Sequence, residues 1–157
     1  MPRTITIVDY GAGNLRSVSR AVAHAGYEPA LTSDPYDVTH AEAVILPGVG
    51  AAADTMRNLR ERGLAGPVRE YIASGRPFFG VCMGQQALLS ISEEGGEHAC
   101  LGVIEGRVKK LPGGQKVPHM GWNRVHQTAA HPIFEGIPDG SYFYFVHSYY
   151  PEPADDS

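Results

Sequence analysis

The chain has 157 residues, 43% of them hydrophobic and 19% charged, which is the composition of a single folded domain rather than of a tail, fibre or repeat array. Its formal net charge of −4, from 13 basic and 17 acidic residues, includes no basic stripe, so we expect no nucleic-acid partner. No run approaches the roughly 18 apolar residues of a membrane span, and the first residues show no signal segment, so we expect a cytoplasmic protein with no membrane partner.

Three strand–turn–helix units follow one another in the first half of the chain. Apolar runs bounded by glycine or proline predict strands at residues 5–8, 43–46 and 77–81. Apolar residues at helical spacing predict helices at residues 15–25, 53–63, 64–74 and 84–94. Because strands that alternate with helices are joined by crossovers, these units predict a mostly parallel sheet covered by helices.

The second half of the chain is strand-like and contains no crossing helix. Strands are predicted at residues 100–111, 116–127 and 141–150, joined by turns rich in proline and glycine. No linker, repeat or low-complexity tract separates them from the first half. We therefore expect an α/β fold with an antiparallel C-terminal extension, in one domain over residues 1–157.

Two cysteines, Cys82 and Cys100, are too few for a disulfide framework. The chain also lacks the Cys-x-x-Cys and cysteine–histidine spacings that are typical of zinc sites. Gly11 and Gly13 follow the first predicted strand, but Arg16 occupies the third glycine position of the dinucleotide-binding pattern. The sequence therefore predicts a reducing compartment, no metal and no cofactor.

Cys82 stands between two glycines, Gly80 and Gly84, where a predicted strand turns into a predicted helix. Such a corner forces a positive φ on its central residue and leaves no room for side chains two residues away, which is the pattern of a nucleophile elbow. The start of a helix also stabilises a thiolate. The sequence thus predicts a nucleophilic Cys82, against the alternative of an ordinary buried core cysteine.

Backbone donors beside the thiol would complete an acyl-transfer site. The Pro47-Gly48-Val49-Gly50 loop ends the neighbouring predicted strand. Its Val49 or Gly50, together with Met83 directly after the nucleophile, is therefore predicted to form an oxyanion hole.

A thiolate nucleophile also needs a general base, and the chain has seven histidines. His147, inside an aromatic strand, is the best candidate, although a core histidine bonded to backbone fits its place equally well. His40 and His131 fall in turn-like stretches and are predicted to be surface residues.

Several segments resemble a known family. Gly80-Val81-Cys82-Met83-Gly84-Gln85-Gln86 and Pro47-Gly48-Val49-Gly50 resemble class I (triad) glutamine amidotransferases. Segments 9–14, 118–123 and 144–149 (DYGAGN, PHMGWN and YFVHSY) resemble, more narrowly, the glutaminase subunits of imidazole glycerol phosphate synthase. The resemblance covers essentially the whole chain. It implies a flavodoxin-like, doubly wound, mostly parallel sheet, hydrolysis of L-glutamine through a cysteinyl thioester, and a heterodimer in which ammonia passes to a cyclase subunit of (β/α)8 barrel fold in histidine biosynthesis.

The same resemblance implies roles for individual residues. Cys82 matches the nucleophile, and Val49 and Gly50 match the oxyanion strand. Contacts to glutamine are implied for Gln86, Glu94, Ser148 and Tyr149. Contacts to the cyclase are implied for Asn14, His119, Met120, Trp122 and Asn123. Helical geometry supports Gln86, one turn past Cys82. It does not support Glu94, because a residue twelve positions along a helix is offset by about 120° around the axis.

One part of the family pattern is missing from the sequence. The catalytic His and Glu of the family belong to a His-Pro-Glu segment, and this chain contains none, since His131-Pro132 is followed by Ile133. We therefore expect the chain to be a C-terminally truncated version of a longer protein. The alternatives are a catalytically incomplete chain that only binds the cyclase and a DJ-1-like protein with a reactive cysteine elbow.

Overall fold

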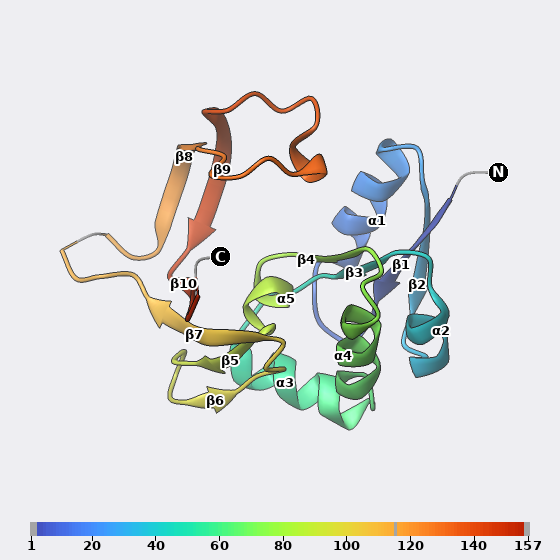
Figure 1. Ribbon diagram of the computed structural model, residues 1–157. Coiled ribbons are helices and arrows are strands. Elements are labelled where there is room, and N and C mark those ends of the chain that lie inside the picture. Colours follow the sequence, from blue (N-terminus) through green and yellow to red (C-terminus); the bar gives the residue numbers. More distant parts are fainter. Residues whose placement is uncertain (1–2, 115, 156–157) are drawn as a thin grey trace. The chain divides into compact units, whose positions relative to one another are not determined.

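A computed structural model describes residues 3–114 and 116–155 of the chain (Figure 1). The chain forms two compact units: unit 1 comprises Met1–Lys109 and Pro151–Ser157, and unit 2 comprises Lys110–Tyr150. In chain order the elements are β1 (Thr4–Val8), α1 (Leu15–His24), β2 (Glu28–Thr32), α2 (Pro35–His40), β3 (Val44–Leu46), α3 (Ala52–Glu61), α4 (Ala65–Ala73), β4 (Phe78–Gly80), α5 (Met83–Gln86), β5 (Leu89–Ser92), β6 (His98–Ala99), β7 (Ile104–Lys110), β8 (His119–Val125), η1 (Pro132–Phe134), β9 (Ser141–His147) and β10 (Tyr149–Pro153).

Unit 1 is built on a parallel sheet in the order β2-β1-β3-β4, which confirms the parallel sheet predicted from the strand–helix alternation. Leu46 lies opposite Gly80, so the carboxyl ends of β3 and β4 are side by side. Strand β2 and helix α2 lie outside the predicted elements. Helix α2 does carry a start signal, because Asp34 accepts a hydrogen bond from the Tyr36 N–H at 2.8 Å and Pro35 follows it.

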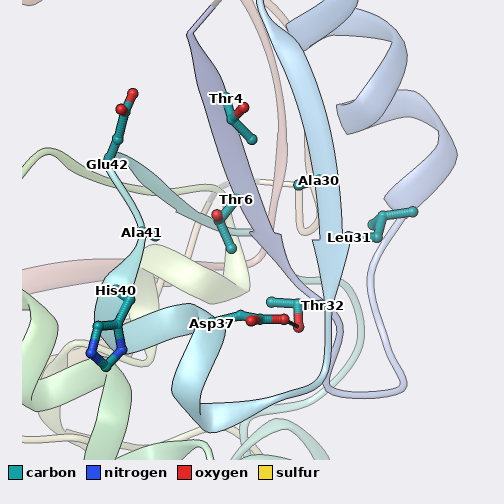
Figure 2. A pocket seen from close by; sticks show the side chains of 9 residues that line it. All are labelled: Thr4, Thr6, Ala30, Leu31, Thr32, Asp37, His40, Ala41 and Glu42. Atoms are coloured by element: carbon teal, nitrogen blue, oxygen red, sulfur yellow. Dashed lines mark hydrogen bonds between the residues drawn. The ribbon is translucent and has the colours of Figure 1, made fainter.

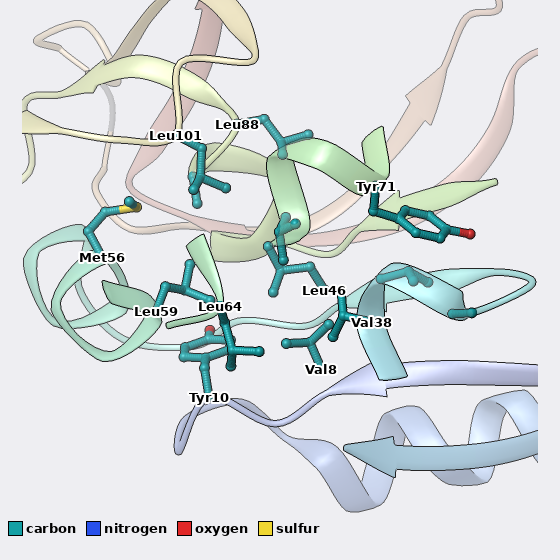
Figure 3. Packing of buried hydrophobic residues seen from close by; sticks show 14 residues of the cluster. Val8, Tyr10, Val38, Leu46, Met56, Leu59, Leu64, Tyr71, Leu88 and Leu101 are labelled. Atoms are coloured by element: carbon teal, nitrogen blue, oxygen red, sulfur yellow. The ribbon is translucent and has the colours of Figure 1, made fainter. Parts of the chain in front are cut away.

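Both faces of the parallel sheet are covered, as parallel sheets require. One face carries the main apolar core, in which side chains from β1, β3, α3 and α4 meet (Figure 3). Ile7 alternates to the other face of β1 and is also fully buried, and helix α1 packs against β1 and β2. The fully buried members of the main core include Val8, Tyr10, Leu46, Leu59, Leu64 and Tyr71.

The predicted helix at residues 84–94 is wrong beyond its first turn. Helix α5 ends at Gln86, and the chain continues as strand β5, which pairs in parallel with β7 and antiparallel with β6. The spacing of Ala87, Leu88 and Ile91 fits a helix as well as a short buried strand. Pairing with two neighbouring strands favours the strand, which no local pattern reveals.

A second sheet of unit 1 has the order β10-β7-β5-β6. Because β5 and β7 are parallel, the C-terminal extension is mixed in this sheet rather than purely antiparallel. Strands β7 and β10 approach so closely that a Cβ at Gly106 would lie 2.4 Å from the Glu152 carbonyl oxygen, and an ion pair between Lys109 and Glu152 joins the same strands.

Unit 2 is an antiparallel hairpin of β8 and β9, which confirms the antiparallel pairing predicted for these segments. His119 lies opposite His147 at one end, and Val125 lies opposite Ser141 at the other. Side chains alternate between the two faces of this ribbon. The single domain expected over residues 1–157 stays a prediction.

Candidate active site

Cys82 has the strained backbone that its two flanking glycines predict. Its φ of 53° makes it the one non-glycine residue with positive φ in the described part of the chain, and its ψ is −112°. A Cβ at Gly84 would lie 1.9 Å from the Leu46 carbonyl oxygen, and a Cβ at Gly80 would lie 2.8 Å from the Gln85 Cα. The side chain of Cys82 is exposed, so the alternative of a buried core cysteine is wrong. The thiol is therefore exposed to solvent, and the close packing at Gly80 and Gly84 leaves the backbone around it little room to move.

The loop after β3 packs directly on the elbow. A Cβ at Gly48 would lie 2.5 Å from the Gly84 nitrogen and 2.6 Å from the Met83 Cβ. The Val81 N–H donates to the Leu46 carbonyl at 3.0 Å, which ties the two strand ends together. The loop that carries Val49 and Gly50 thus lies beside Met83, as an oxyanion hole requires.

Three backbone N–H groups of this arrangement are available to a ligand. Those of Val49, Gly50 and Met83 donate no hydrogen bond to any group that the structure describes. The next amides of the elbow are engaged, because the N–H groups of Gln85 and Gln86 both donate to the Cys82 carbonyl at 3.0 Å. The available donors are therefore the ones predicted for the oxyanion hole.

Gln86 and Glu94 lie on different elements of unit 1. Gln86 closes the single turn of α5, one turn past Cys82, and is buried. Glu94 follows β5, so the argument from helical drift does not apply to it. Its Oε2 accepts a hydrogen bond from the Ala52 N–H at 3.0 Å, at the start of α3 and directly after the loop that ends at Gly50. The structure thus brings Glu94 to the loop of the predicted oxyanion hole.

Two buried hydroxyls belong to the surroundings of the elbow. Burial raises the pKa of Tyr10 above its ordinary value, and the charge of Cys82 adds to this shift. The hydroxyl of Thr55 is close enough to oppose the shift, but it lies outside hydrogen-bonding geometry. Neither hydroxyl has a hydrogen-bond partner within the described residues. The sequence offers no signal for this pair, because the residues are far apart along the chain.

The histidines of unit 1 are His24, His40 and His98. His24, His40 and His98 make no hydrogen bond with Cys82 among the residues described. His40 ends helix α2 instead of lying in a turn, and its ring stacks on Tyr36 with centroids 3.9 Å apart. It is exposed, as predicted.

In unit 2, His147 is half-buried and bonded to backbone. Its Nδ1 lies 3.0 Å from the Tyr149 carbonyl oxygen, which can only accept, so Nδ1 carries the proton. This favours the alternative of a structural histidine. The Asn123 amide donates to His119 Nε2 at 2.6 Å, and the rings of His119 and His147 meet edge to face. His131 caps η1 at the surface, as its turn-like stretch predicts.

One face of the hairpin is apolar and exposed. Met120 lies opposite Val146, and Trp122, which is 66% exposed, lies opposite Tyr144 with their rings in edge contact. Exposed apolar patches of this kind mark contact surfaces.

The structure also describes Asn14, Ser148 and Tyr149, the other predicted contact residues. The side chain of Asn14 is exposed and caps α1 by accepting from the Ser17 N–H. The carbonyl of Ser148 accepts from the Leu111 N–H at 2.9 Å, and Tyr149 begins β10. Neither arrangement tests the contacts that are predicted for these side chains.

A groove of about 430 Å³ lies over β1, β2 and α2 (Figure 2). Thr4 and Thr6 line it from β1, and the Thr32 hydroxyl donates to Asp37 Oδ2 at 2.7 Å. Neither Cys82 nor any other predicted site residue lines this groove.

Within residues 3–114 and 116–155, no group of three or more histidine, cysteine, aspartate or glutamate side chains is placed to hold a metal ion. None of the helices described has both the length and the apolar character needed to cross a bilayer.

The chain is similar to several known proteins. A family model described as glutamine amidotransferase class-I matches residues 6–157. The chain is 55% identical over 151 residues to the imidazole glycerol phosphate synthase subunit HisH of Dehalococcoides mccartyi (strain CBDB1), covering 96% of this chain and 74% of that protein. It is 52% identical over 154 residues to the subunit of the same description from Moorella thermoacetica, covering 98% of this chain and 73% of that protein.

A solved structure described as a crystal structure of glutamine amidotransferase superposes with a TM-score of 0.73 at 22% sequence identity. The match covers 96% of this chain and 75% of that one. At this identity the likeness shows the fold alone, an α/β fold with a parallel sheet and mixed or antiparallel sheets after it.

Proposed function

Because the chain belongs to the class-I glutamine amidotransferase family, we propose that it is the glutaminase subunit of an imidazole glycerol phosphate synthase, at work in the cytoplasm in histidine biosynthesis. Its substrate is L-glutamine, and its products are glutamate and ammonia. The single observation that carries the proposal is the exposed thiol of Cys82 at a positive-φ corner packed against the loop of Val49 and Gly50.

The reaction follows from this geometry. The Cys82 sulfur attacks the side-chain carbonyl carbon of glutamine, and the carbonyl oxygen becomes an oxyanion that receives hydrogen bonds from the N–H groups of Met83 and of Val49 or Gly50. The carbon–nitrogen bond then breaks, and the nitrogen takes up a proton and leaves as ammonia. Water attacks the thioester that remains, the carbon–sulfur bond breaks, and glutamate and the free thiol are released.

Four residues are assigned to binding of the substrate. Gln86, buried in the turn after Cys82, and Glu94, beside the start of α3, are assigned to the amino-acid part of glutamine. Ser148 and Tyr149 of the other unit are assigned to the same part of the substrate on the strength of the family resemblance. These polar groups fix the orientation that a near-attack geometry needs.

The proton transfers need a base that the proposal does not assign within these 157 residues, since they contain no His-Pro-Glu segment. Strand β4 leads directly to Cys82 and forms one edge of the four-stranded sheet described here. A further strand paired with that edge would carry side chains to the thiol. His147 is the alternative base, with Nε2 as its acceptor nitrogen.

The partner is the cyclase subunit, of (β/α)8 barrel fold, in a heterodimer. We assign the contact to the exposed apolar face of Met120 and Trp122. His119 and Asn123 of the same strand, and Asn14 of unit 1, are assigned to the contact on the strength of the family resemblance. Ammonia passes from the thioester site to the cyclase, which consumes it.

The test measures glutamate release by the chain together with the cyclase subunit. Cys82→Ala should lower the rate at least about 1,000-fold, because the nucleophile acts as a unit with its surroundings. Cys100→Ala is the matched control: the Cys100 thiol is half-buried, its pKa is raised by burial, and it should leave the rate unchanged. Glutamine hydrolysis that survives in Cys82→Ala would refute the assignment.

A second candidate is a chain that binds the cyclase without turning over glutamine, because no histidine is hydrogen-bonded to Cys82 among the residues described. It predicts a stable complex with no glutamate released above the Cys82→Ala background. The DJ-1-like alternative predicts no complex and ready oxidation of Cys82 to a sulfinic acid. The family match argues against it.

A further inference from the structure

We propose that Glu94 is a positioning residue that holds the oxyanion loop by capping helix α3, in addition to its contact with substrate. The inference rests on the proposed glutaminase function. The carboxylate reaches across 42 residues of sequence to the first N–H of α3, immediately after the loop that contains Val49 and Gly50.

Helix α3 has no cap of its own. Its N-cap residue, Ala51, has φ −97° and ψ 152°, the extended backbone of an N-cap, but offers no side-chain oxygen. Ala52 is 2% exposed, so its N–H is shielded from water. Without Glu94 this donor would be buried and unpaired, which costs more than the loss of an exposed hydrogen bond.

Glu94 is itself held in place. Its own N–H donates to Ser92 Oγ at 3.3 Å, and Ser92 is fully buried at the end of β5. The end of strand β5 therefore fixes the position of the carboxylate. A negative charge at the positive end of a ten-residue helix is also favourable electrostatically.

One oxygen of the carboxylate is engaged and the other is available. Oε2 receives the Ala52 N–H, whereas Oε1 accepts no hydrogen bond from the residues described. The α-ammonium of glutamine can pair with Oε1 while Oε2 keeps the cap. A single side chain then fixes both the substrate and the loop whose N–H groups receive the oxyanion, so its loss should affect KM and kcat separately.

Three variants separate the two roles. Glu94→Gln keeps an acceptor oxygen for Ala52 but loses the charge that pairs with the ammonium. Glu94→Ala loses both. The double variant Ala51→Ser with Glu94→Ala gives α3 a local cap, because serine suits the extended backbone at position 51, but it does not restore the contact with substrate.

The readouts are hydrogen exchange of the amides of residues 52–54 without glutamine, and kcat and KM for glutamine in the complex with the cyclase. We expect exchange in Glu94→Ala to be about fivefold faster, the effect of losing a typical cap. In the double variant we expect protection to return at residues 53 and 54, because an N-cap hydroxyl accepts from the second or third N–H of a helix. We expect kcat to recover with the cap while KM stays high. In Glu94→Gln, KM should rise with kcat and protection largely kept.

Two results would overturn the inference: unchanged protection of residues 52–54 in Glu94→Ala, or a double variant with restored protection and a kcat no higher than that of Glu94→Ala. A wild-type complex without glutaminase activity would instead refute the proposed function. In that case the exchange comparison still tests the cap.

Discussion

Replacement of Gly84 by alanine tests the elbow most directly. The added Cβ would lie 1.9 Å from the Leu46 carbonyl oxygen, about 1.5 Å inside the distance of ordinary van der Waals contact. The atom in the way belongs to backbone, so no side-chain rotation relieves the clash. The carbonyl must retreat, which breaks its hydrogen bond with the Val81 N–H.

We expect Gly84→Ala to lower the free energy of unfolding by about 3 kcal/mol or more, from overpacking together with the lost hydrogen bond. Gly80→Ala should cost less, since its Cβ would lie 2.8 Å from the Gln85 Cα. The matched control is Gly66→Ala in helix α4, where a Cβ meets nothing within 4 Å. It should stabilise the chain by about 0.5 kcal/mol, because alanine is the better helix former.

Urea unfolding followed by circular dichroism measures all three differences. The reasoning is refuted if Gly84→Ala stays within about 1 kcal/mol of the wild type while Gly66→Ala behaves as expected. The milder Gly80→Ala keeps the test informative if Gly84→Ala does not fold.

Two further predictions concern Tyr10 and the hairpin. Tyr10→Phe removes a buried hydroxyl that has no partner in the described residues, so stability near neutral pH should stay the same or rise by about 1 kcal/mol. Burial raises the pKa of Tyr10, so the free energy of unfolding of the wild type should fall as the pH rises above about 10, where Tyr10 ionises in the unfolded chain. Tyr10→Phe should lose less stability over the same pH range. An equal fall in the two proteins would contradict this. Trp122→Ala should weaken cyclase binding by about 2 kcal/mol, roughly 30-fold in Kd, whereas Leu31→Ala, also an exposed apolar residue, should not; calorimetry distinguishes them.

The sequence predicts structure most reliably where a local pattern is compatible with one backbone conformation or one topology. Gly80 and Gly84 predict the positive φ of Cys82 because only a sharp corner excludes side chains on both sides. The alternation of strands and helices likewise predicts the parallel sheet, since crossovers leave little choice of topology.

Where the outcome depends on distant partners, the sequence predicts less. Ala87 to Ser92 has the spacing of a helix, yet its pairing with β6 and β7 makes it extended. The contact of Glu94 with Ala52 spans 42 residues and depends on that same strand, so an argument from helical spacing could not reach it. The free N–H groups around Cys82 are likewise visible only once the loop and the elbow are packed together.

The two-stranded form of the hairpin has a consequence for how the protein is handled. A ribbon of two strands is too thin to bury the side chains of both its faces, so Met120, Trp122 and Tyr144 remain in water until another surface covers them. When the subunit is produced alone, these exposed apolar side chains favour self-association, which increases with protein concentration. Yield and colloidal behaviour should then depend on the ratio in which the two subunits are made, which favours synthesis of the pair in equal amounts.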